Sequence, residues 1–207
     1  MAEPADIRDL DGYPVTPDTV LAAYRLRCFP MCEHRAAPIA WYRPLRRAII
    51  TWDRYRVPRS LAKVLRNRRP FRLTVDRDFA AVIAACAERP DTWIGRDIEA
   101  LYCELHRRGH AHSVEAWDGD GKLVGGLYGL AVGGCFSGES MFHRVDDAAK
   151  ACVVHLVALL QDLGYSVLDC QQQSAHMARF GAYEVSDAEY ARLLAEAPPP
   201  RPWPRAG

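Results

Sequence analysis

The apolar and polar positions along the chain predict helices and strands in alternation. Apolar residues recur at helical spacing in the segments 16–27, 59–69, 78–88, 96–108, 146–163 and 174–180. Short apolar or alternating runs, bounded by turn residues, predict strands at 49–52, 71–75, 111–117, 123–132, 134–141, 166–170 and 182–185. From residue 71 onward the expected order of elements is therefore β-α-α-β-β-β-α-β-α-β.

This order matches the acyl-CoA N-acyltransferase (GNAT) architecture, in which helices flank a mixed sheet that opens around a cleft for the acyl donor. We therefore expect an α+β, GNAT-like catalytic domain over residues 71–207, ending in a loose Pro-rich tail, and a small α/β domain before it over residues 1–70. Fold alone assigns no chemistry. The segment that should bind the pyrophosphate of coenzyme A, residues 142–148, has no glycine and contains Asp146 and Asp147, so it makes a poor phosphate site.

The basic residues are concentrated in one part of the chain. The 207 residues have a formal net charge of only +1, but residues 43–72 contain eleven basic residues and one acidic residue, a net charge of +10. Such a block favours a polyanionic partner, and the alternative is a solvated basic face. Neighbouring aromatic residues that could stack on unpaired bases favour RNA: Trp41, Tyr42, Trp52 and Tyr55. The amphipathic helix over 59–69 is expected to bind a nucleic-acid backbone through Arg59, Lys63, Arg66, Arg68 and Arg69.

Composition and cysteine usage favour a cytoplasmic protein with no membrane span. No apolar run approaches the roughly 18 residues that a span needs, and the first ten residues lack the apolar stretch of a secretory signal. Seven cysteines cannot all pair in disulfides, which fits a reducing compartment. The spacing of His110 and His112, and that of Cys28, Cys32 and His34, matches no zinc motif, so we expect no metal.

Two short segments could carry chemistry. Asp169 and Gln171 end a short apolar strand at positions i and i+2, so their side chains should point to one face, where the carboxylate could orient the amide toward an incoming amine. The alternative is a capped strand end. Glu139 lies between a glycine and a serine at the end of another strand, where it could pair with an ammonium group or form a structural salt bridge.

Several segments together resemble a known family. They are Ala23-Tyr24-Arg25, Phe29-Pro30, Thr92-Trp93-Ile94, residues 105–115, residues 123–129, Gly138-Glu139-Ser140-Met141-Phe142, Leu168-Asp169-Cys170-Gln171 and Arg179-Phe180-Gly181-Ala182. In this order they resemble the bacterial leucyl/phenylalanyl-tRNA–protein transferases from about residue 16 to about residue 190. The resemblance implies transfer of Leu or Phe, with Met as a further candidate, from aminoacyl-tRNA to proteins with N-terminal Lys or Arg. The product is an N-degron. The resemblance also implies no metal and no coenzyme A, and we expect a monomer.

The resemblance also implies a catalytic arrangement. Asp169 and Gln171 match the family's proposed catalytic pair, and Glu139 matches its substrate-holding glutamate. An aminoacyl ester is already activated, so the enzyme mainly aligns an amine with the carbonyl and removes one proton. Our hypothesis is that Gln171, polarised by Asp169, accepts a hydrogen bond from the amine while Glu139 holds a substrate ammonium.

The same resemblance, together with the apolar residues around these motifs, suggests where the aminoacyl group and the tRNA 3′ end bind. The expected contacts are Trp93, Tyr102, Leu127, Phe136, Ser140 and Met141. The family commonly has Trp after Phe-Pro, whereas this chain has Met31. Two alternatives follow for the aromatic platform under the terminal adenine: it is missing from this chain, or Trp41 or Tyr42 supplies it.

Two other functions remain open at this stage. A coenzyme A-dependent N-acetyltransferase shares the architecture, but it lacks support from a pyrophosphate loop. A non-catalytic RNA-binding protein built on a decayed acyltransferase would bind tRNA without turnover, and the joint presence of Asp169, Gln171 and Glu139 speaks against it.

Overall fold

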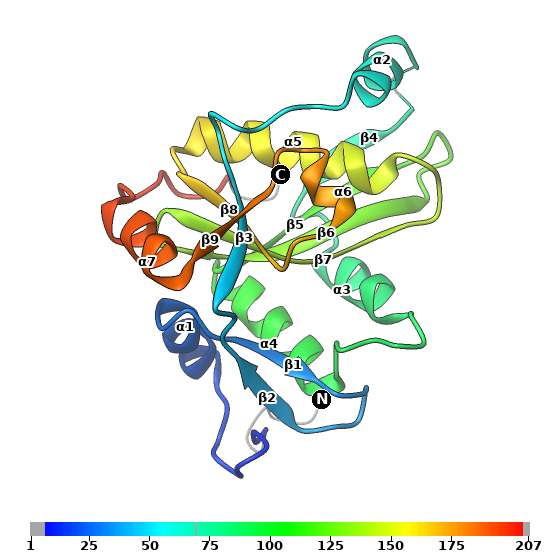
Figure 1. The fold of residues 1–207 in the computed structure, drawn as a ribbon. Coiled ribbons are helices and arrows are strands. Elements are labelled where there is room, and N and C mark those ends of the chain that lie inside the picture. Colours follow the sequence, from blue (N-terminus) through cyan, green and yellow to red (C-terminus); the bar gives the residue numbers. More distant parts are fainter. Residues whose placement is uncertain (1–6, 69, 205–207) are drawn as a thin grey trace.

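The computed structural model describes residues 7–68 and 70–204, whose strands form a two-stranded and a seven-stranded sheet. The helices are α1 (Pro17–Arg25), α2 (Arg59–Arg68), α3 (Phe79–Ala87), α4 (Arg96–Arg107), α5 (Ala148–Leu163), α6 (Ala175–Ala178) and α7 (Asp187–Glu196). The strands are β1 (Phe29–Cys32), β2 (Ile39–Tyr42), β3 (Arg46–Thr51), β4 (Arg72–Val75), β5 (Ala111–Trp117), β6 (Leu123–Val132), β7 (Cys135–His143), β8 (Val167–Gln171) and β9 (Tyr183–Ser186). Helices cover both faces of the larger sheet, with α5 on one and α3 and α4 on the other (Figure 1).

Every helix and strand expected between residues 71 and 185 is present, with ends that differ by a few residues. The expected helix over 16–27, the helix over 59–69 and the strand over 49–52 also form. Three elements were not expected: β1, β2 and α7. Pro30 indicates the end of a helix in the sequence, but it lies in β1 and pairs with Trp41 of β2. The start of α7 has a cap that the sequence contains, because the Ser186 side chain accepts a hydrogen bond from the Glu189 N–H.

The large sheet is mixed and mostly antiparallel. Its strand order is β4-β5-β6-β7-β8-β3-β9, and only the β7–β8 pair is parallel. This confirms an α+β fold with flanking helices. β3 lies between β8 and β9, although it precedes residue 70, so the larger sheet includes a strand from the segment assigned to an N-terminal domain. A division of the chain into two domains at residue 70 stays a prediction.

The position of α5 over the sheet depends on a close approach to β6. A side chain at Gly125 would place its Cβ 2.6 Å from the Cβ of Ala148 and 3.0 Å from the backbone nitrogen of Ala149. Glycine therefore allows the first turn of α5 to lie directly against the strand. The apolar side of the helix, including Leu156 and Leu160, is buried against the sheet.

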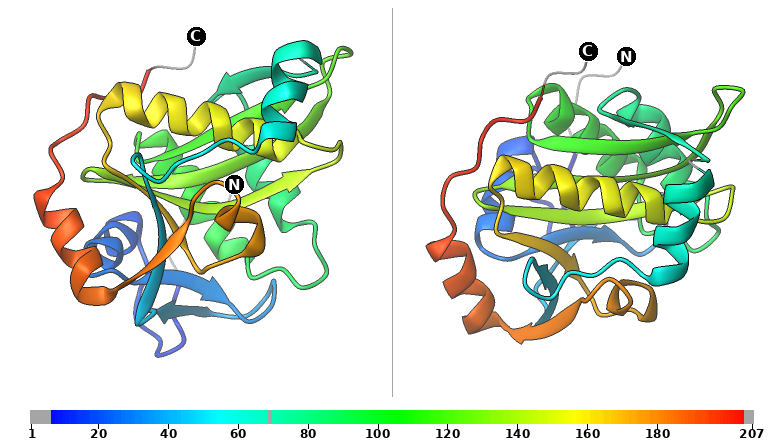
Figure 2. Two further views of the ribbon diagram at one scale, coloured as in Figure 1. Left: turned by 45° about the horizontal axis from the view of Figure 1, so that its top comes forward. Right: turned by 90° about the horizontal axis from the view of Figure 1, so that it is seen from above.

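The Pro-rich tail is attached to the sheet, so the expectation of a loose tail is wrong for residues up to 204. The indole of Trp203 stacks on His112, with ring centroids 4.0 Å apart and planes 7° apart, and donates a hydrogen bond to the Tyr165 hydroxyl at 2.8 Å. The Arg201 N–H donates to the Leu163 carbonyl at the end of α5. Figure 2 shows this segment passing from α7 along the C-terminal end of α5. The sequence missed these contacts because Trp203 finds its partners at distant positions.

Candidate active site

A cavity opens where β7 and β8 separate. The two strands pair only at Cys135–Ser137 with Val167–Asp169, and each then continues without the other. The cavity has a volume of about 190 Å³. Its walls come from both strands, β6, α5 and α6, and include Leu127, Glu139, Met141, Leu156, Gln171 and Met177. The opening therefore places an apolar pocket beside the polar side chains of Glu139 and Gln171.

Glu139 and Gln171 meet across this opening. The Gln171 Nε2 donates a hydrogen bond to Glu139 Oε1 at 3.0 Å. Glu139 is only 7% exposed, and its other oxygen, Oε2, has no hydrogen-bond partner among the described residues. Burial raises the pKa of Glu139 to about 7, against the opposing effects of the Tyr24 hydroxyl and the Gln171 amide. The carboxyl group is thus poised to exchange a proton near neutral pH.

Two tyrosines from the helices below the sheet lie beside Glu139. Tyr24 of α1 and Tyr102 of α4 are buried, and their hydroxyl oxygens are 2.6 Å apart. Burial and the nearby Glu139 carboxyl raise the pKa of both hydroxyls. Both tyrosines therefore stay protonated at neutral pH and can support a negative charge on Glu139.

Asp169 forms no hydrogen bond with the side-chain amide of Gln171. Its carboxylate instead accepts a hydrogen bond from the backbone N–H of Gln171 at 2.8 Å, and Arg47, Ser137 and Tyr190 also donate to its oxygens. The hypothesis that Asp169 polarises the Gln171 side chain is therefore wrong, because that amide donates to Glu139 instead. Strand alternation missed this difference because Gln171 has a φ of +60°, which turns the chain out of the extended conformation.

The expected aminoacyl-pocket residues divide into two groups. Three of them line the cavity: Leu127, Ser140 and Met141. Ser140 also accepts a hydrogen bond from Arg89 of the loop after α3 at 2.6 Å. Phe136 lies elsewhere, fully buried in the core with its ring 5.4 Å from that of Trp203. Tyr102 lies beneath Glu139 and is not among the cavity-lining residues.

The sequence of this chain is similar to those of known proteins. A family model described as leucyl/phenylalanyl-tRNA protein transferase matches residues 49–195, more than half of the chain. The chain belongs to this family. A leucyl/phenylalanyl-tRNA–protein transferase from Rubrobacter xylanophilus is 50% identical over 183 residues, which cover 88% of this chain and 95% of the relative.

Two further relatives of the family carry the same name. The proteins from Rhizorhabdus wittichii and Ruegeria pomeroyi are 49% and 44% identical, each over 87% of this chain and over 74% and 86% of their own lengths. Among solved structures, the L-PGS from Bacillus licheniformis has a TM-score of 0.45 at 12% identity. The match covers 74% of this chain and 50% of that chain.

The basic segment of this family member is partly neutralised by residues that are distant in sequence. Arg43 forms an ion pair with Asp187 at 2.6 Å, and Arg46 forms one with Glu184 at 3.1 Å. Arg47 is buried and also paired. The net charge of residues 43–72 therefore overstates the charge that is left for a polyanion, because β9 and α7 supply acidic partners.

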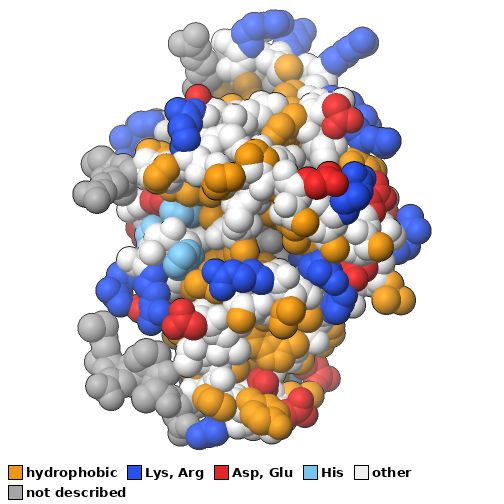
Figure 3. Space-filling model, turned by 90° about the vertical axis from the view of Figure 1, so that its left-hand side faces the viewer, with side chains coloured by type: hydrophobic (Ala, Val, Ile, Leu, Met, Phe, Trp, Pro, Cys, Tyr) orange, Lys and Arg blue, Asp and Glu red, His pale blue; other side chains and the backbone are white. Residues whose placement is uncertain are grey.

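α2 keeps its basic side chains exposed. Three residues that were expected to bind the nucleic-acid backbone have described side chains: Arg59, Lys63 and Arg66. All three are exposed, and none has an acidic partner within residues 7–68 and 70–204. The side chain of Arg68 and the whole of Arg69 lie outside the described part of the chain. Leu61 on the opposite side is buried in the same apolar cluster as α5. Figure 3 shows Lys and Arg side chains at the top of the molecule, where Figure 1 places α2.

Four aromatic residues that were expected to stack on bases or to contact the tRNA 3′ end are spread over the structure. Trp52 is held in place by a hydrogen bond to the Tyr165 carbonyl at 2.6 Å, and Trp41 is half-buried and donates to Asp9 at 3.2 Å. Trp93 lies in the loop before α4 and packs against the core. Tyr42 is 45% exposed. The structure therefore brings none of these four into the cavity between β7 and β8.

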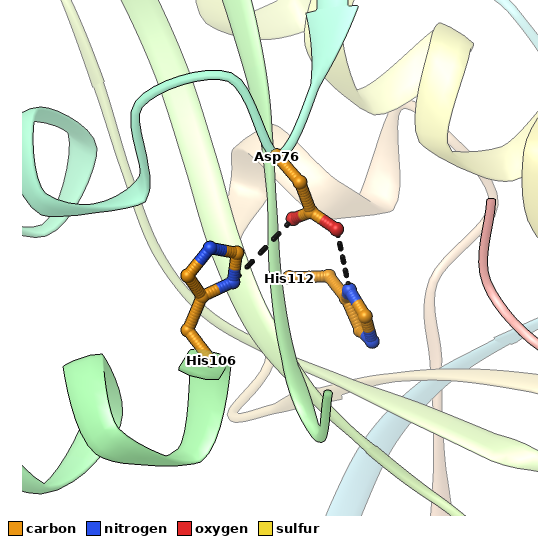
Figure 4. Close-up of side chains that lie close together, drawn as sticks. All are labelled: Asp76, His106 and His112. Atoms are coloured by element: carbon orange, nitrogen blue, oxygen red, sulfur yellow. Dashed lines mark hydrogen bonds and ion pairs between the residues drawn. The ribbon is translucent and has the colours of Figure 1, made fainter. Parts of the chain in front are cut away.

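One histidine cluster has side chains of the metal-binding type. Asp76, His106 and His112 offer three ligand atoms within 4.8 Å of one another, and Figure 4 shows the carboxylate between the two imidazoles. Each of these ligand groups already has a hydrogen-bond partner. Asp76 bonds His112 Nδ1 at 2.7 Å and the Ser113 N–H at 2.8 Å, and His106 Nδ1 bonds the Ala111 carbonyl at 2.8 Å. His112 Nε2 is buried without a hydrogen-bond partner among the described residues, and its ring stacks on Trp203. The hydrogen bonds at Asp76 and this stacking favour a structural role.

Sequence reasoning missed four buried residues that contact Asp169 or Glu139. Arg47, Tyr190, Ser137 and Tyr24 all contact the catalytic candidates or their partners. One signal was present for Arg47, because it directly precedes the apolar run of β3, where alternate side chains enter the core.

Among the described residues, no helix is both long and apolar enough to cross a membrane.

Proposed function

We propose that this protein transfers Leu or Phe from aminoacyl-tRNA to the α-amino group of an acceptor protein whose N-terminal residue is Lys or Arg. The observation that carries the proposal is the contact between Gln171 and Glu139 at the edge of an apolar cavity. The names of relatives that match most of the chain support the same reaction. The preference for Lys or Arg follows from the motif resemblance.

Glu139 is the proton acceptor in this proposal. The α-amine of an acceptor has a pKa of about 7.7–8.0, so it arrives largely as an ammonium ion. Glu139 Oε2 is unpartnered among the described residues and can bind this ammonium ion, and a carboxyl with a pKa of about 7 can take one proton from it. Gln171 Oε1, which accepts no hydrogen bond within the described chain, would then orient the free amine.

The transfer step balances without a cofactor. The amine nitrogen attacks the ester carbonyl carbon, so a C–N bond forms. The C–O bond to the ribose breaks, and the second amine proton leaves with the ribose oxygen. The ester supplies the activation, and the protein supplies alignment and proton removal. We therefore assign no role to coenzyme A or to a metal in this reaction.

The apolar cavity would take the side chain of the transferred amino acid. Leu127, Val153, Leu156 and Met177 form a surface of aliphatic groups, and Met141 lies at its edge. Such a surface favours Leu or Phe over a polar side chain, because a polar group would lose its hydrogen bonds to water there. The separation of the parallel strands β7 and β8 around this cavity supports a GNAT-like arrangement.

The basic side of α2 would bind the tRNA backbone. Its exposed cations and its position on the outside of the larger sheet support this role. A monomeric state, a cytoplasmic location and the two-domain division remain predictions from the sequence.

A peptide assay tests the reaction directly. The pure protein is incubated with Leu-charged tRNA and a peptide that begins with Arg, and the peptide is then weighed by mass spectrometry. We expect the peptide to gain one leucine residue. The same peptide with an acetylated N-terminus should stay unchanged, because it has no free α-amine. No gain with either peptide, from Leu- or Phe-charged tRNA, would refute the proposed function.

A matched pair of charge variants tests the tRNA interaction. The first variant changes three α2 residues to alanine: Arg59, Lys63 and Arg66. The control removes the same charge elsewhere: Arg25, Arg107 and Arg192. Only the α2 variant should weaken tRNA binding and reduce the slope of log affinity against log salt, by about 1 for each phosphate that is no longer bound. Equal effects of the two variants would show that α2 makes no specific interaction with the tRNA.

A further inference from the structure

Both carboxylate oxygens of the buried Asp169 accept hydrogen bonds from neighbouring residues. It is 0% exposed, and its oxygens accept hydrogen bonds from Arg47 Nε at 3.0 and 3.1 Å and from Arg47 Nη2 at 2.7 Å. The Tyr190 hydroxyl donates at 2.9 Å, the Ser137 hydroxyl at 3.2 Å and the Gln171 N–H at 2.8 Å. These donors occupy both oxygens, so the carboxylate has no free lone pair directed at a substrate.

Arg47 is equally enclosed. Only 2% of the residue is exposed, and its remaining guanidinium nitrogen, Nη1, donates to the Arg27 carbonyl at 3.0 Å. The rings of Phe29 and Tyr190 lie 5.1 and 4.9 Å from its Cζ. Because a guanidinium group keeps its proton in proteins, Asp169 always faces a positive charge. Loss of either partner would leave the other charge buried without a counter-ion, which is strongly unfavourable.

The hydrogen bond from Asp169 to the Gln171 backbone has a structural consequence. Gln171 has a φ of +60°, a left-handed conformation that residues other than glycine rarely adopt without support. Asp169 Oδ1 accepts the N–H of this residue and so stabilises the turn. The turn ends β8 and directs the Gln171 amide toward Glu139. The ion pair and the catalytic contact are therefore two residues apart on one short segment.

We propose that Arg47 is a positioning residue for the transfer reaction: the Arg47–Asp169 pair, braced by Tyr190, holds Gln171 in its left-handed turn so that its amide stays against Glu139. Asp169 then acts as an anchor and Glu139 takes the proton. This inference rests on the proposed function of the same site. It links three distant parts of the chain, because Arg47 comes from β3, Asp169 from β8 and Tyr190 from α7.

Tyr190→Phe gives the first test, because it removes one donor to Asp169 and keeps the ring. If Asp169 is an anchor, kcat falls while KM for the acceptor and the pH at which the rate is half-maximal stay at the wild-type values. If Asp169 is instead the proton acceptor, the loss of a hydrogen-bond donor to it moves the rate profile along the pH axis. Such a shift would overturn the proposal.

A double-variant cycle gives the second test. Asp169→Asn and Arg47→Met each leave one buried charge unpaired, whereas the double variant removes both charges and keeps an oxygen at position 169 for the Gln171 N–H. We expect single-turnover transfer by the double variant to exceed that of Asp169→Asn by about tenfold, with the wild-type pH profile. A double variant that binds tRNA normally but transfers no faster than Asp169→Asn would overturn the proposal.

The proposed function and this inference fail in different ways. If the protein is not an aminoacyltransferase, the wild type itself gives no transfer in the peptide assay. If only the inference is wrong, the wild type is active and the Tyr190→Phe profile moves. Normal tRNA binding and the thermal unfolding of each variant show which losses come from misfolding, and Tyr190→Phe keeps the test decisive when a charge variant fails to fold.

Discussion

Glu139→Gln should remove a pH dependence from the free energy of unfolding. The size of that dependence follows from the raised pKa of the buried Glu139 carboxyl. Burial raises the pKa of Glu139 from 4.5 to about 7 in the folded protein. Between these two values, the folded protein holds a proton that the unfolded chain has released. The free energy of unfolding therefore falls as the pH rises through this window. At about 1.4 kcal/mol for each pKa unit, the wild type loses about 3 kcal/mol.

Gln at position 139 does not titrate, so the variant lacks this loss. Urea unfolding at pH 4.5, 5.5, 7 and 8 measures the difference in stability between Glu139→Gln and the wild type. We expect that difference to shift in favour of the variant by about 3 kcal/mol between the lowest and the highest pH. Titrations of other groups are common to both proteins and cancel in the difference.

Glu104→Gln is the matched control. Two arginines hold the pKa of Glu104 down at about 2, through hydrogen bonds from Arg107 and Arg108, so this carboxylate is ionised in the folded protein over the whole range measured. Its stability difference from the wild type should therefore stay nearly constant above pH 5.5. Parallel stability curves for the wild type and Glu139→Gln would refute the reasoning, because they would show that Glu139 is ionised at low pH as an ordinary carboxyl.

Three other changes have defined outcomes. Trp203→Ala should lower the free energy of unfolding by about 2 kcal/mol in urea, because it removes the ring on His112, and an unchanged value would mean a detached tail. Gly181→Ala should cost more than about 1 kcal/mol in the same assay, since φ is +100° and a Cβ would overlap a backbone carbonyl. Leu127→Phe should narrow the cavity and lower kcat/KM for Phe-tRNA more than for Leu-tRNA. Equal losses would place the amino acid side chain elsewhere.

Local patterns were sufficient for most of the fold. Helix α5 has an apolar side at regular spacing and ends at Gly164, whose φ is +85°, so both its length and its end could be predicted from neighbouring residues. β1 could not be predicted in this way, because Pro30 indicates a helix stop and its pairing with Trp41 is a contact between separate segments. The order of the strands in the sheet, with β3 between β8 and β9, also depends on such contacts.

In the candidate site, too, the sequence identified the residues but not their contacts with distant segments. Motifs identified Glu139 and Gln171, but the sequence assigned the Gln171 amide to Asp169, its neighbour along the chain. The structure pairs that amide with a residue on another strand and pairs Asp169 with Arg47, which is 122 positions away. Counting charges along the chain likewise included Arg47 in the basic block of residues 43–72, although the structure pairs it with Asp169. Residue type and spacing thus identified the groups that take part, and only the fold could show which of them are neutralised.

The cavity and its catalytic contact have one geometric origin, the short parallel pairing of β7 and β8. Ser137 and Asp169 form the last pair of the ladder, and their side chains are joined by a hydrogen bond. Two residues further along each strand come Glu139 and Gln171, which meet at 3.0 Å as the strands part. A longer ladder would close the cavity, and a shorter one would leave Gln171 without the anchor at Asp169. The point at which the pairing stops therefore determines both the space for the amino acid and the position of the groups that would act on it.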